Sequence, residues 1–229
     1  MKKFHSKIRS KVIAAIIAVM FIVGLFFVLE FTPTISAQAG DVMAQKIFYY
    51  HVPSAWTAFL AYFFVMIAGI QYLRTQKPKW DWIGLASAEI GTLFCLLVLV
   101  SGPIWAKAAW GQPWTWEPRL LTTLILFLIY VGYFMLRQFG GHYERVARNS
   151  AVLGIVAFID VPVVYFSLKF WSVEVQAHPQ TQMVGQSTKI LWVFIFILLG
   201  FTLLFIHMLR FRVYILSLKQ KMLEKSYGI

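Results

Sequence analysis

Long apolar runs separated by short polar connections dominate the pattern along this chain. A helix that crosses a bilayer needs about 20 mostly apolar residues. Six runs reach this length, and they cover residues 12–31, 55–73, 83–106, 120–136, 151–170 and 190–209. The pattern therefore predicts an all-α integral membrane protein with six transmembrane helices. No polar linker is long enough to separate domains, so we expect residues 1–229 to form a single membrane domain.

The composition agrees with this prediction. Hydrophobic residues make up 60% of the chain and charged residues 13%, about half the charged fraction of an ordinary soluble domain. The net charge of +12 could indicate a nucleic-acid partner, but the basic residues are concentrated in alternate connections. Membrane proteins show this distribution, with Lys and Arg on the cytoplasmic side. We therefore expect the lipid bilayer, and no nucleic acid, as the partner.

The basic residues also predict the orientation. The N-terminal tail has five Lys and Arg, the 74–82 and 137–150 connections have three each, and the segment from Arg210 has five. Together these hold 16 of the 21 basic residues. Both termini are therefore expected in the cytoplasm, with the connections at 32–54, 107–119 and 171–189 on the opposite side.

The first apolar run bears on signal-peptide cleavage, and the single cysteine bears on disulfides and covalent haem attachment. Basic residues precede this run and an Ala37-x-Ala39 pattern follows it, as in a cleavable signal peptide. The run is longer than the usual 7 to 15 residues of a signal peptide, which favours an uncleaved anchor. Cys95 has no partner cysteine, so it excludes an internal disulfide and a Cys-x-x-Cys-His haem attachment.

Two acidic residues fall inside predicted spans. Glu89 is flanked by Gly84, Ala88 and Gly91, a small-residue face on which another helix can pack closely. Glu89 either pairs inside the bundle or contacts a partner subunit. Asp160 is a candidate functional residue, although a protonated or paired carboxyl is the favoured interpretation.

The connections on the side opposite the termini are longer and richer in aromatic residues. In the first of them, apolar positions between 42 and 50 recur at near-helical spacing, which predicts a short helix along the membrane surface. Pro53 is then expected at the first position of the second spanning helix.

His51 and His178 lie in two of these connections, each near a proline and close to the membrane boundary. One such histidine is usually an interfacial side chain, but two on one face favour a pair of ligands. A bare metal ion requires more ligands than two imidazoles supply. A haem brings four equatorial nitrogens and needs only axial ligands, so the pair points to haem iron.

Tryptophans gather between these histidines in "WAKAAWGQPWTWEPRL", residues 105–120. Four of the nine tryptophans lie there within twelve residues, and Gly111, Pro113 and Pro118 prevent a continuous helix. An interfacial aromatic belt is one interpretation of this cluster. A flat surface on which an apolar ligand packs is the interpretation we favour, because belt tryptophans are spread over all helix ends.

The run "WGQPWTWEPRL" resembles the Trp-Gly-x-x-Trp-x-Trp-Asp signature of the haem-handling proteins of cytochrome c biogenesis. "YYHVPSAW" and "VPVVYFSLKFWSVEVQAHP" resemble the histidine-bearing segments of the haem exporter protein C family within that group. The resemblance covers about residues 40–210. It implies that His51 and His178 are axial ligands of a non-covalent, b-type haem. It also implies a haem platform formed by Trp110, Gly111, Trp114, Trp116 and Glu117.

The resemblance further implies a bacterial inner-membrane protein that delivers haem to a periplasmic haem chaperone. Its implied partners are ABC-type transporter subunits and a small membrane subunit. Glu117 stands where the family usually has Asp, and Asp160 replaces an amide. Arg119 follows the platform directly, and its guanidinium suits either a haem propionate or a lipid phosphate.

The chain contains neither a Gly-x-x-x-x-Gly-Lys-Ser/Thr nucleotide motif nor a nucleophile with a neighbouring base, so we do not expect an enzyme. Two other functions remain open. A b-type electron-transfer subunit would hold its haem permanently between histidines. A secondary transporter would instead use Glu89 and Asp160 at a midplane site.

Overall fold

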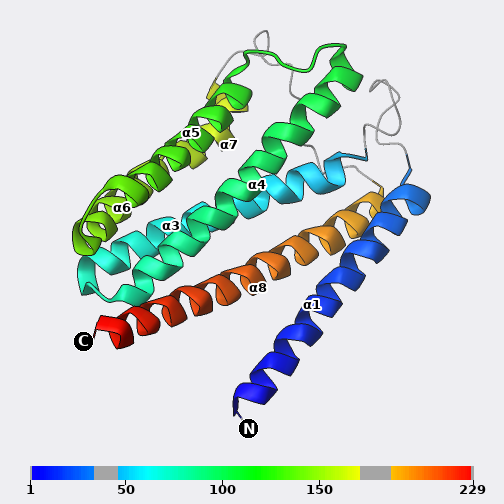
Figure 1. Ribbon diagram of the computed structural model, residues 1–229. Helices are drawn as coiled ribbons and strands as arrows, with labels where there is room; N and C mark the ends of the chain where they lie inside the picture. The colour runs from blue at the N-terminus through cyan, green and yellow to red at the C-terminus, as the bar shows by residue number, and fades with distance from the viewer. Residues whose placement is uncertain (1, 34–45, 171–186, 228–229) are drawn as a thin grey trace. The chain divides into compact units, whose positions relative to one another are not determined.

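The structure is a computed structural model that describes residues 2–33, 46–170 and 187–227. All regular elements in these ranges are helical, and Figure 1 shows them in chain order. They are α1 (Lys2–Phe26), a π-helical turn (Phe27–Phe31), α3 (Phe48–Thr75), α4 (Pro78–Trp110), α5 (Pro118–Phe139), α6 (Tyr143–Ala157), α7 (Asp160–Phe170) and α8 (Thr188–Tyr227). Six helical stretches are long and apolar enough to cross a membrane, which confirms the predicted fold class.

These stretches overlap all six predicted spans and extend beyond most of them. They cover Ser10–Phe31, Phe48–Thr75, Pro78–Ala108, Pro118–Phe139, Tyr143–Ser167 and Thr188–Ser226. The largest extension is in α8, which continues from the predicted end at 209 to Tyr227. The apolar runs therefore locate the spans. The helices are longer than these runs because polar residues at their ends also adopt helical structure.

The described residues fall into two compact units. The first contains α1, the π-helical turn, α3 up to Thr57, α4 from Leu97 and α8 up to His207. The second contains α3 from Ala58, α4 up to Leu96, α5, α6, α7 and α8 from Met208. The single membrane domain stays a prediction.

The second spanning helix begins earlier than predicted. α3 starts at Phe48, so the prediction that Pro53 occupies its first position is wrong. The His51 N–H donates to the Ile47 carbonyl at 2.8 Å, so a helical turn has formed before the proline. Pro53 lacks an N–H and removes one backbone hydrogen bond, a loss that is small near a helix start. The predicted surface helix over 42–50 lies largely outside the described residues.

The fifth apolar run forms two helices, α6 and α7, rather than the single helix predicted over 151–170. Pro162 explains the break, because it has no N–H to donate to the Phe158 carbonyl and its ring crowds that carbonyl. The Val161 N–H bonds the Phe158 carbonyl instead, at 3.1 Å. Asp160 thereby becomes the first residue of α7, where a carboxylate interacts favourably with the helix dipole.

Small residues allow α4 to pack closely on α3 in the second unit, as the sequence predicted. A Cβ added at Gly91 would lie 2.8 Å from the Tyr62 ring, and one at Gly84 would lie 3.6 Å from the Ala68 Cβ. Tyr62 in turn stacks on Tyr130 of α5, with ring centroids 3.9 Å apart. The close approach of α3 and α4 therefore depends on Gly91, where any side chain would displace an aromatic ring.

Candidate functional site

His51 lies in the first turn of α3 and contacts α4. Its Nδ1 is 2.8 Å from the Oγ of Ser101. The Ser101 hydroxyl also lies 2.6 Å from the Leu97 carbonyl, one turn earlier in α4. A Cβ built on Gly102 would lie 3.4 Å from the His51 Cε1, so the imidazole lies beside this residue of α4. The ring is therefore oriented by a second helix.

Aromatic contacts attach the same turn of α3 to α8 within the first unit. Phe48 stacks on Phe194 with ring centroids 5.2 Å apart, and Tyr50 meets Phe201 edge-on at 6.2 Å. Such pairs contribute about 0.5 to 1.5 kcal/mol each beyond the burial of their area. The backbone that carries His51 is thus held by α4 on one side and by α8 on another.

The tryptophan-rich segment is non-helical only over residues 111–117. α4 ends at Trp110, and Gly111 follows with φ +78°. The Gly111 N–H donates to the Lys107 carbonyl at 3.0 Å, which is the left-handed cap that commonly ends helices. Pro118 then opens α5 at a position where its missing N–H costs nothing. The predicted interruption of the helix is confirmed.

The platform tryptophans differ in exposure. The Trp116 side chain is 75% exposed. Trp114 is half-buried and its indole Nε1 is buried. Trp110 is the last residue of α4, and its side chain lies outside the described part of the structure. Trp116 is thus the described indole whose faces are most available to a ligand.

Glu117 and Arg119 lie at the start of α5. Glu117 is 3% exposed and stands at the N-cap position without a side-chain capping bond. Asp at this position could cap the helix, whereas the longer Glu side chain is a poor cap. The Glu117 carboxylate instead interacts electrostatically with Arg119, whose Nη2 donates to the Tyr165 carbonyl of α7 at 3.1 Å.

His178 lies outside the described residues, so the geometry of the predicted ligand pair is not part of the structure. The described residues bring His51 together with Ser101 and Gly102, and Glu117 together with Arg119. The predicted contact between Arg119 and a propionate stays a prediction.

Comparison with known proteins identifies the family. The family model described as Heme exporter protein C matches residues 2–226. The chain belongs to this family. It is 35% identical to Heme exporter protein C of Bradyrhizobium diazoefficiens over 177 residues, which are 75% of this chain and 67% of the relative. It is 31% identical to Heme exporter protein C of Haemophilus influenzae over 181 residues, 79% of this chain and 72% of the relative.

A plant protein is also similar. A Marchantia polymorpha protein, named as a cytochrome c biosynthesis ccmC-like mitochondrial protein, is 35% identical over 127 residues. These residues are 56% of this chain and 53% of that protein. The family resemblance proposed from the tryptophan and histidine segments is therefore confirmed.

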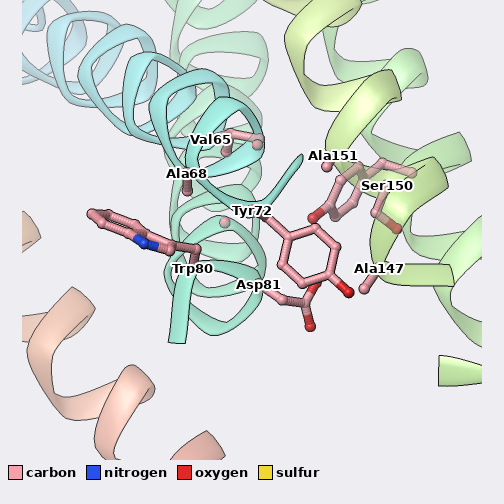
Figure 2. A pocket seen from close by; sticks show the side chains of 11 residues that line it. Val65, Ala68, Tyr72, Trp80, Asp81, Ala147, Ser150 and Ala151 are labelled. Carbon is pink, nitrogen blue, oxygen red and sulfur yellow. The ribbon is translucent and has the colours of Figure 1, made fainter. Parts of the chain in front are cut away.

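This member of the Heme exporter protein C family also has a buried charge cluster that sequence reasoning missed. In the second unit, the Arg137 Nη1 and Nη2 donate to the two Asp81 carboxylate oxygens at 2.7 and 2.9 Å. The Tyr143 hydroxyl donates to the same carboxylate at 3.1 Å. Figure 2 shows Asp81 beside Tyr72 in a small pocket with room for about one water molecule. The cluster connects the starts of α4 and α6 with the end of α5.

Glu89 pairs inside the chain, which decides between the two possibilities left open by the sequence. The Arg212 Nε and Nη2 lie 2.6 and 2.7 Å from its two carboxylate oxygens. The Oδ2 of Asp160 is buried, and the described residues offer it no hydrogen bond. A transporter site formed by Glu89 and Asp160 is therefore disfavoured, because Glu89 is already neutralised by Arg212.

Proposed function

We propose that this protein binds haem non-covalently near one membrane surface and presents it for delivery during cytochrome c maturation. The observation that carries the proposal is the geometry of His51 in a member of the Heme exporter protein C family. Its imidazole is fixed at the start of a spanning helix rather than buried at mid-span. A ligand at the edge of the bilayer suits loading and release of haem.

The residues of this chain fit such a cargo. We propose His51 and His178 as the two axial ligands, since haem supplies the four equatorial nitrogens and leaves two axial positions. The exposed Trp116 indole offers an apolar face for the macrocycle. Gly111 and Pro118 keep the segment between them non-helical. Its side chains are therefore not held at helical spacing around a helix axis. Arg119 is the proposed propionate contact.

We propose a bacterial inner-membrane location with both termini in the cytoplasm, so that His51 and His178 face the periplasm. The distribution of Lys and Arg supports this orientation. The proposed receiver is a periplasmic haem chaperone, and the proposed neighbours are ABC-type transporter subunits and a small membrane subunit. Any ATP hydrolysis then occurs in those subunits.

Delivery is tested by the absorption spectrum of the purified protein and by transfer of its haem. We expect a haem band in the full-length protein in lipid nanodiscs, which decreases when the purified apo-chaperone is added. The same band should then appear on the chaperone after separation. A haem that stays with the membrane protein would support the b-type electron-transfer alternative, and the absence of any haem band after haem loading would contradict both.

Replacing Trp116 by Ala is expected to weaken haem binding about tenfold to a hundredfold. The reason is that bound haem would cover the exposed indole, and burial of such an aromatic side chain contributes about 1.5 to 3 kcal/mol. The measurement is a haem titration of the apo-protein. Trp192 of α8 provides the matched control, because it is 67% exposed, close to the 75% of Trp116, but lies outside the segment. Equal affinities for Trp116→Ala, Trp192→Ala and the parent protein would assign Trp116 to an interfacial belt.

A further inference from the structure

We propose that Ser101 is a positioning residue that holds His51 in the tautomer required to bind iron. In this tautomer the proton is on Nδ1, and the lone pair on Nε2 is offered to the metal. The inference rests on the proposed role of His51 as a haem ligand. It extends that role to a residue on another helix, 50 positions further along the chain.

The direction of the hydrogen bonds follows from counting protons. A serine hydroxyl has one hydrogen to donate and two lone pairs that accept. The Leu97 carbonyl can only accept, so the 2.6 Å contact to it uses the Ser101 hydrogen. Towards His51, at 2.8 Å, the Ser101 oxygen is therefore the acceptor, and Nδ1 must be the donor. In a neutral imidazole the other nitrogen, Nε2, then holds the lone pair.

The packing around the ring keeps His51 beside Ser101. The imidazole Cε1 lies beside Gly102 of α4, 3.4 Å from a Cβ built there, which is an ordinary van der Waals distance. Leu97, Ser101 and Gly102 belong to the same part of one helix, and the aromatic contacts of Phe48 and Tyr50 hold the turn that carries His51. The donor and acceptor are therefore aligned by two anchored helices before any haem arrives.

A hydrogen bond to the non-ligating nitrogen is a general way to orient an imidazole ligand, and loss of such a partner costs about 10- to 100-fold in metal affinity. We therefore expect Ser101→Ala to weaken haem binding by that factor. Ser101→Thr should bind as the parent does, because its hydroxyl can make the same two contacts. Ser54→Ala is the matched control, since Ser54 also bonds a carbonyl one turn earlier, that of Tyr50 at 2.7 Å.

The tautomer is tested without haem, by nitrogen-15 NMR of the full-length apo-protein labelled at histidine, at a pH where imidazole is neutral. The His51 signals are assigned by their loss in His51→Gly. We expect a protonated Nδ1 in the parent, Ser101→Thr and Ser54→Ala proteins. In Ser101→Ala we expect a shift towards the form protonated on Nε2. A parent ring protonated on Nε2, or a Ser101→Ala ring with the parent's tautomer, would overturn the inference.

The haem titration separates this inference from the proposed function. A Ser101→Ala protein with the altered tautomer but with undiminished haem affinity would overturn the positioning role while leaving haem binding intact. The proposed ligand role of His51 fails through a different result, namely a His51→Gly protein that binds haem as firmly as the parent.

Discussion

Replacing Asp81 by Ala is expected to lower the free energy of unfolding by about 3 to 5 kcal/mol, because it leaves a buried cation without its partner. The Asp81 and Arg137 side chains are only 4% and 12% exposed. The change removes both guanidinium contacts and the bond from Tyr143 at once. The measurement is denaturation of the full-length protein in mixed micelles, followed by its helical circular dichroism.

Three further variants separate the buried charge from other effects. Tyr143→Phe removes a single hydrogen bond to the carboxylate and should cost about 1.5 to 3 kcal/mol. Glu224→Ala, at an exposed acidic residue of α8, should change stability by no more than about 0.5 kcal/mol. The double variant Asp81→Leu with Arg137→Met should be close to the parent, because no charge is then left unpaired. A loss in the double variant as large as in Asp81→Ala would contradict this explanation.

Replacing His51 or His178 by Gly is expected to lower haem affinity by on the order of a hundredfold or more, which corresponds to about 2.8 kcal/mol. Loss of a residue that hydrogen-bonds to a metal ligand already lowers metal affinity about 10- to 100-fold. Loss of the ligand itself should lower the affinity by more. The measurement is a haem titration of each apo-protein, with the absorption spectrum recorded at every step.

His142→Gly and His207→Gly are the controls for this prediction. His142 precedes α6 and His207 lies within α8, and both are expected on the cytoplasmic side. Neither change should alter haem affinity. A loss with the cytoplasmic variants equal to that with His51→Gly would show that the histidines act through stability and not through coordination.

The sequence predicted the fold class and the number of spans, because about 20 consecutive apolar residues have few alternatives to a membrane helix. It did not predict where the helices begin and break. The start of α3 at Phe48 and the separation of α6 from α7 depend on backbone hydrogen bonds around Pro53 and Pro162. Apolar character continues through both positions, so hydropathy alone locates neither; Pro162 is a sequence signal for the break, whereas the start of α3 depends on the backbone bonds that precede Pro53.

The candidate site was only partly accessible from the sequence. Local chemistry predicted the interruption at Gly111 and Pro118. The position of His51 near the membrane boundary, together with the family resemblance, indicated it as a candidate ligand. The partners of His51 and Asp81 were missed, because they lie 50 and 56 positions away along the chain. Ser101 is a polar residue near the end of the predicted span 83–106, which marks it as a residue that could contact another polar group. Its pairing with His51 depends on how α3 and α4 pack.

The most direct test of haem ligation is the addition of imidazole to the haem-loaded His51→Gly and His178→Gly proteins. Coordination requires the nitrogen lone pair and not its link to the chain, so free imidazole can occupy the position that each variant leaves open. We predict that imidazole partly restores the six-coordinate spectrum of the parent in both variants. Spectra of both variants that already match the parent before imidazole is added would contradict the account, because the iron would then be ligated by other residues.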